Sequence, residues 1–134
     1  AVATSSKGTA LAASDVYQCL NIPAESVILH AGIQCEVAAT GTSSDAAYDL
    51  GITGGDVDNF VDGFDADAAS AGDYAATPAA FNPVIVPAAD TLDILVAAQT
   101  GTTLTGKFRV FATLMDISGQ AGLGADEVDR DTLA

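Results

Sequence analysis

The segment from residue 27 to residue 37 alternates apolar or small side chains with other residues more regularly than any other part of the chain. The even positions include His30, Gln34 and Glu36. A period of two is the pattern of a β-strand with one buried and one solvated face. An antiparallel sheet with one face in water suits such a strand better than a parallel sheet covered on both sides. The odd positions, which we expect to be buried, are Val27, Leu29, Ala31, Ile33, Cys35 and Val37.

Further segments with strand character follow at short intervals, separated by turns that contain Pro, Gly or Asp, and no long amphipathic helix interrupts them. This spacing predicts an all-β fold, an antiparallel β-sandwich of the eight-stranded, jelly-roll-like kind. The other predicted strands lie at about 15–22, 48–52, 57–64, 82–86, 91–98 and 104–117, with a short strand near Tyr74 inside a long surface loop over 65–82.

The two ends of the chain lack this period. Residues 1–13 are small and polar, and residues 118–134 are rich in Gly and Asp. We therefore expect a flexible N-terminal arm over 1–13, one sandwich domain over 14–117, and a C-terminal tail over 118–134. A chain of 134 residues has the usual size of a single domain.

Charge narrows the range of partners. The chain carries 4 Lys and Arg against 18 Asp and Glu, for a formal net charge of −14. Such a surface repels phosphate groups, so we expect neither nucleic acid nor an anionic membrane surface as a partner. No apolar run approaches the length that spans a membrane.

Nothing in the sequence points to catalysis. A nucleophilic triad needs a histidine, and the single histidine, His30, lies in the middle of a predicted strand on its polar face. Carboxylates are so plentiful that a pair of them is not diagnostic of a glycosidase. Phosphate-binding and dinucleotide-binding motifs are missing as well. We expect no enzyme activity, no catalytic residue and no cofactor.

The acidic segment 56–67 is the one candidate for a cation site. Asp56, Asp58 and Asp62 fall on one side of the predicted strand, and carboxylates at alternate positions can supply ligands to calcium. The segment lacks EF-hand spacing, and a solvated strand face produces the same pattern. A solvated acidic strand is therefore the preferred interpretation, with a cation site as the alternative.

The two cysteines, Cys19 and Cys35, cannot form a usual zinc site with a single histidine. We expect them to be small, partly buried thiols. A disulfide between neighbouring strands is the alternative.

The last predicted strand carries apolar side chains on both faces. Its inward face is expected to hold Phe108, Val110, Ala112 and Leu114. Phe111, Met115 and Ile117 lie on the opposite face, where water is expected, and three apolar residues on one strand face suggest a partner. These three residues are the predicted interface. The alternative is that the C-terminal tail or the loop over 65–82 covers them.

Several short segments between Asp15 and Ile117 occur in an order that resembles the small virion structural proteins of tailed phages, of the capsid decoration or cement type. The segments are Asp15-Val-Tyr-Gln before Ile22-Pro23-Ala24, then Val27-Ile-Leu-His-Ala-Gly-Ile, then Asp49-Leu-Gly-Ile before Asp58 and Phe60-Val-Asp-Gly63, then Ala88-Ala89-Asp90-Thr91-Leu92-Asp93-Ile94, and finally Arg109-Val-Phe near Met115-Asp116-Ile117.

This resemblance implies a non-enzymatic β-sandwich that decorates or cements the outer surface of a phage capsid. The implied partners are the major capsid protein and further copies of the chain, often three, in a virion assembled in the host cytoplasm. A head-fibre or tail subunit is an alternative place in the virion. A secreted carbohydrate-binding or adhesive module, or a surface-layer or pilus-type subunit, is the alternative outside it. Carbohydrate-binding modules usually expose aromatic side chains, whereas this chain has only three Tyr and no Trp, which counts against that alternative.

Overall fold

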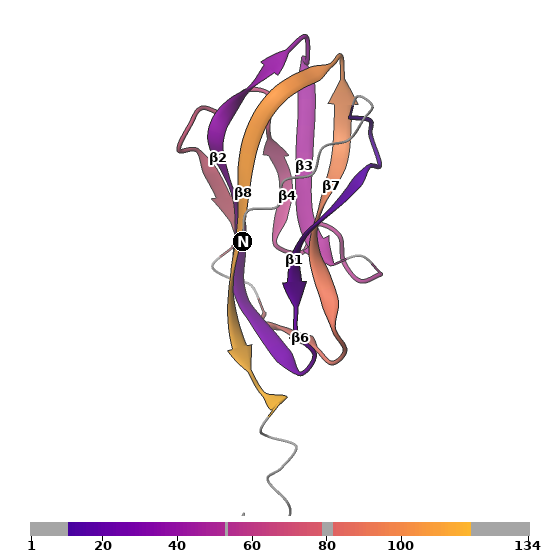
Figure 1. Ribbon diagram of the computed structural model, residues 1–134, viewed down its shortest axis with the longest axis vertical. Helices are drawn as coiled ribbons and strands as arrows, with labels where there is room; N and C mark the ends of the chain where they lie inside the picture. The colour runs from indigo at the N-terminus through magenta and orange to yellow at the C-terminus, as the bar shows by residue number, and fades with distance from the viewer. Residues whose placement is uncertain (1–10, 53, 79–81, 119–134) are drawn as a thin grey trace, which may run out of the picture.

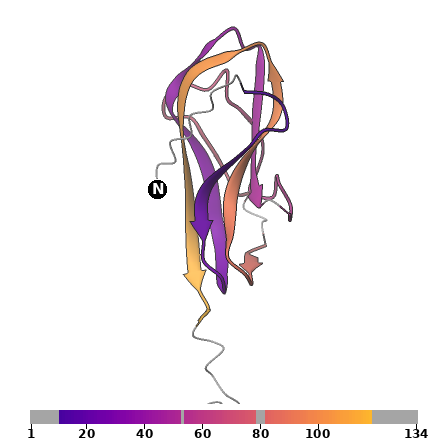
Figure 2. The same cartoon turned by 45° about the vertical axis from the view of Figure 1, so that its right-hand side comes forward.

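The computed structural model describes residues 11–52, 54–78 and 82–118. Two antiparallel sheets face each other and form a β-sandwich, as predicted (Figures 1 and 2). Sheet A has the order β1-β7-β3-β4, with bounds β1 Val16–Ile22, β7 Asp90–Thr100, β3 Asp45–Ile52 and β4 Val61–Asp65. Sheet B contains β2 Ser26–Gly41, β5 Tyr74–Ala76, β6 Val84–Val86 and β8 Thr103–Asp116.

Strand β2 is the centre of sheet B. Strand β8 pairs with β2 from Ser26 to Gly41 along one edge. The short strands β5 and β6 pair with the other edge at different heights, β5 opposite Gly32–Gln34 and β6 opposite Ser26–Ile28. Sheet B is therefore three strands wide at both heights, with β2 in the middle.

The core lies between the two sheets and contains almost no polar groups. Its largest fully buried side chains come from both layers and from the segment before β4. Two aromatic pairs join the layers, because Phe108 of β8 makes edge-to-face contacts with Tyr48 and Phe64 of sheet A. The largest fully buried side chains are Ile22, Ile28, Ile33, Cys35, Leu50, Phe60, Leu92 and Val96.

The alternation predicted for residues 27–37 is only partly right. Ala31, Ile33 and Cys35 are fully buried in the core, whereas Leu29 and Val37 are 39% and 53% exposed. The pairing of β2 with β8 shifts between Ile28 and His30 and again between Cys35 and Val37. Each β-bulge adds one residue to β2 and reverses the faces beyond it. The prediction of buried side chains at 29 and 37 is therefore wrong.

Other features also differ from the prediction: β2 extends to Gly41 and β3 begins at Asp45, earlier than expected. The expected strand over 57–64 begins only at Val61, because residues 56–60 form a turn that passes over Gly51 of β3. Leu114, expected in the core, is 38% exposed, since it lies near the end of the edge strand β8.

The predicted arm and tail lie almost entirely outside the described residues. Within the described segment, Leu11 packs against the core and the Ser14 N–H donates to the Val96 carbonyl at 2.8 Å. Among the described residues, no helix is both long and apolar enough to cross a membrane.

Candidate interaction surface

The outer face of sheet B carries an apolar row across three strands. Val27 of β2 is opposite Ile85 of β6 and opposite Met115 of β8. Its neighbour Ile28 is fully buried in the core, so Val27 faces outward. Val27 is nevertheless only 7% exposed, whereas Ile85 is 64% and Met115 is 47% exposed. We call Ile85, Val27 and Met115 the apolar row.

Phe111 lies further along the same face and is partly covered by the protein itself. Its ring covers Gly32, where an added Cβ would lie 2.5 Å from the ring carbon Cζ. The His30 ring stacks on it with a centroid distance of 5.8 Å and an interplanar angle of 30°. Phe111 is therefore half-buried. A change at this residue would disturb the sheet as well as any contact that the sheet makes.

The other two residues of the predicted interface lie at the far end of β8. Met115 belongs to the apolar row. Ile117 follows the strand, and its N–H donates to the Glu25 carbonyl at 2.9 Å. The side chain of Ile117 is half-buried. The structure thus places the three residues along one side of the molecule and leaves Met115 the most exposed of them.

The opposite end of the same face is charged. Lys107 and Arg109 of β8 both form ion pairs with Glu36 of β2, the Lys107 pair at 2.5 Å. Hydrogen bonding from Lys107, with the nearby positive charge of Arg109, holds the pKa of Glu36 below its ordinary value. Lys107 and Arg109 are the only Lys and Arg among the described residues.

Sheet A and its loops carry most of the described carboxylates. Among the cation candidates, a side-chain hydrogen bond that the protonated Asp56 donates to Asp58 raises the pKa of Asp56, and Asp62 lies exposed on β4. Within the described ranges, no three His, Cys, Asp or Glu side chains come together to hold a metal ion. The carboxylates of sheet A and its loops are Asp15, Asp45, Asp49, Asp56, Asp58, Asp62, Asp65, Asp67, Asp90 and Asp93.

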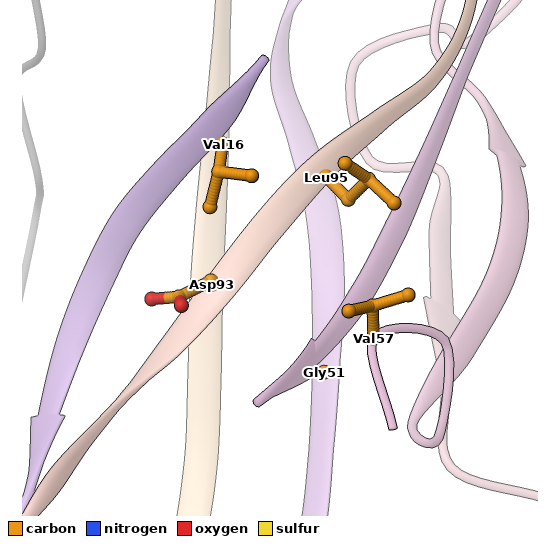
Figure 3. Close-up of a pocket in the computed structure, with 5 residues that line it drawn as sticks. All are labelled: Val16, Gly51, Val57, Asp93 and Leu95. Carbon is orange, nitrogen blue, oxygen red and sulfur yellow. The ribbon is translucent and has the colours of Figure 1, made fainter. Parts of the chain in front are cut away.

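A small depression lies on sheet A, lined by Val16, Gly51, Val57, Asp93 and Leu95 (Figure 3). It holds about 10 Å³, which is no more than the space for one water molecule. The depression is therefore too small to bind a substrate.

Asp49 of β3 is the clearest electrostatic feature of sheet A. The residue is 7% exposed, and its Oδ1 accepts a hydrogen bond from the Gly63 N–H at 2.8 Å. Burial raises the pKa of Asp49 above the usual 3.8, the Gly63 N–H opposes this shift, and Asp62 and Asp58 add to it. The fold therefore favours the neutral form of this carboxyl.

We expect Asp49→Asn to stabilise the protein at neutral pH and to have a smaller effect in acid. Because the folded-state pKa is raised, the parent keeps its full stability below the unfolded-state pKa and loses part of it as pH rises through the folded-state pKa. The asparagine does not ionise, so the variant gains free energy of unfolding relative to the parent as pH rises through that window. Above the window the difference stays constant. Urea unfolding across pH measures this, with exposed Asp45→Asn as the control for removing one charge. An advantage of Asp49→Asn that is independent of pH would contradict the assignment.

The two cysteines are free thiols in different sheets, Cys19 on β1 and Cys35 on β2. A disulfide between neighbouring strands would require the two cysteines to lie on adjacent strands, and they do not. Burial raises the pKa of both thiols, which favours the unreactive protonated form.

No family model and no curated protein matches this sequence. Among solved structures, a chain from the "Capsid of Ralstonia phage GP4" has a similar fold, with a TM-score of 0.58. The two chains are 17% identical, and the match covers 80% of this chain and 76% of that chain. At this identity the similarity concerns the fold alone.

Sequence reasoning missed the residues that complete the apolar row. It identified Met115 from the pattern of the last strand and predicted correctly that Val27 is buried, but it also expected Leu29 to be buried and gave Ile85 no role. The available signal was the strand character of 82–86, which carries three consecutive aliphatic residues in Val84–Val86. Which of these lies beside Met115 depends on the register of β6 and β8 on β2, and that register is visible only in the fold.

Proposed function

We propose that the protein is a non-enzymatic virion structural protein that decorates or cements the outer surface of a phage capsid. The observation that carries this proposal is the shared fold over 80% of the chain with a chain of the Ralstonia phage GP4 capsid. The order of sequence segments between Asp15 and Ile117 supports the same assignment independently of the fold.

The physical character of the domain agrees with a role in assembly. The sandwich buries its large apolar side chains between two sheets, and the depression on sheet A is too small for a substrate. Its exposed features are an acidic face on sheet A and an apolar row on sheet B. A surface of this kind suits contacts with other proteins.

The proposed partners are the major capsid protein and further copies of the chain, arranged as a trimer. Phe111, Met115 and Ile117 contribute to these contacts. The protein resides on the capsid surface and is assembled with it in the host cytoplasm, where Cys19 and Cys35 stay reduced. Nucleic acid and membrane are not partners, because a net charge of −14 opposes both.

We expect the purified protein to bind capsids of its own phage that were prepared without it. Co-sedimentation should saturate at a fixed ratio to the major capsid protein, because the capsid lattice offers a fixed number of equivalent sites. An unrelated protein of similar net charge controls for non-specific association. Protein that stays in the supernatant at every concentration would contradict the proposed function.

A further inference from the structure

We infer that copies of this chain meet through the outer face of sheet B at the end formed by β6, the start of β2 and the end of β8. The apolar row lies at the centre of this contact. The inference rests on the self-association proposed above and assigns to it a surface and an occupant, a second copy of the same chain. It adds to the contact Val27 and Leu29 of β2 and Ile85 of β6. These three residues were not part of the interface predicted from the sequence.

The exposure of these side chains is the first argument. Ile85 and Met115 flank Val27, and they are 64% and 47% exposed. Leu29, two residues along β2 and 39% exposed, extends the patch toward Phe111 because the bulge turns it out of the core. Apolar side chains that lie together on three adjacent strands form a continuous patch, and patches of this kind mark contact sites.

The distribution of charge identifies the occupant. Any contact between copies through sheet A would bring its many carboxylates together, in a protein whose net charge is −14. The outer face of sheet B carries instead the apolar row and, at its other end, Glu36 paired with two cations. Contact through this face brings fewer carboxylates together than contact through sheet A would, and it leaves both acidic faces in solvent.

Two carboxylates at the edge of the patch set the salt dependence. Asp116 follows Met115 at the end of β8, with its side chain on the other face of the strand, and Glu25 lies in the turn just before Ser26; both are exposed. Copies that meet at the apolar row bring these groups closer together. We therefore expect association to strengthen as salt screens the repulsion.

The area of the patch limits the affinity with which two copies can associate. From Val27 to Gly32, which is opposite Phe111, the patch covers roughly 20 Å by 14 Å, or on the order of 300 Å² per copy, from the usual strand rise and spacing. Stable interfaces bury about 800 Å² per partner. Association in dilute solution should therefore be modest and dependent on concentration.

The deciding experiment compares two aspartate variants by sedimentation at high salt over a wide range of protein concentration. Ile85→Asp places a charge on the apolar row, at a side chain exposed enough to leave the fold intact. Val16→Asp adds the same charge on sheet A at a side chain that is 48% exposed. We expect Ile85→Asp to weaken association by about tenfold or more, as for the loss of a central contact residue, and Val16→Asp by no more than about twofold.

A cross-linking measurement supports this comparison. The double variant Ile85→Cys with Met115→Cys should form disulfides between copies under mild oxidation, whereas Val16→Cys should not. If the parent associates and Ile85→Asp associates equally well, the chain self-associates through another surface and the assignment to the apolar row is wrong. If the parent is a monomer at high salt and high concentration, both the self-association and its assignment to the apolar row are wrong. The capsid-binding experiment still tests the proposed function separately.

Discussion

Replacing Phe60 by alanine is expected to lower the free energy of unfolding by about 3–5 kcal/mol. The Phe60 ring is 1% exposed in the core, although it lies outside any strand. Its backbone N–H donates to the Leu50 carbonyl at 3.0 Å and fixes the turn to β3. A domain of this size has a total stability of about 5–15 kcal/mol, so this variant should approach the limit of folding.

Urea unfolding followed by circular dichroism measures the effect. Val57→Ala is the matched control, since Val57 lies in the same turn but is 39% exposed. We expect this control to cost less than about 1 kcal/mol. Equal losses for the two variants would show that the turn does not hold Phe60 in the core as described.

The second large effect is expected at Gly51. A Cβ at this position would overlap the Asp56 carbonyl oxygen and the Val57 backbone, because the turn over 56–60 passes directly across β3. Backbone atoms cannot move aside as a flexible side chain does, so Gly51→Ala must lift the turn that carries Phe60. We expect a loss of about 2–3 kcal/mol.

Gly55→Ala is the control for Gly51→Ala. Gly55 lies just outside the crossing, and a Cβ there would have its nearest neighbour, the Ile52 carbonyl oxygen, at 3.5 Å. We expect the stability of this variant to stay within about 0.5 kcal/mol of the parent, as for other changes that create no clash. A Gly51→Ala variant as stable as Gly55→Ala would contradict the close crossing of the turn over β3.

Much of the fold could be predicted from the sequence because strand periodicity survives wherever pairing is regular. Leu92, Ile94 and Val96 of β7 are buried as the alternation indicates, and so are Tyr48 and Leu50 of β3. The main failures occur at the bulges of β2, in the turn before β4 and at Leu114 near the end of β8. A bulge inserts one residue without changing the composition of the strand, so the pattern alone does not reveal where the faces reverse.

The candidate surface shows the same limit in another form. Met115 could be found from its own strand, because it breaks the expected polar face. Ile85 and Val27 could not, because their position beside Met115 depends on pairing between strands that are distant in sequence. Phe111 was identified correctly as lying outside the core, but its contacts with Gly32 and His30 needed the fold as well.

The most direct test of the account is quantitative mass spectrometry of purified phage particles, with heads and tails separated. A protein that decorates or cements the capsid should be present in the head fraction at a fixed copy number relative to the major capsid protein. It should remain there after washing at high salt, which strengthens apolar contacts between acidic subunits. Absence of the chain from the particles, or its presence only in the tail fraction, would contradict the proposed role on the capsid surface.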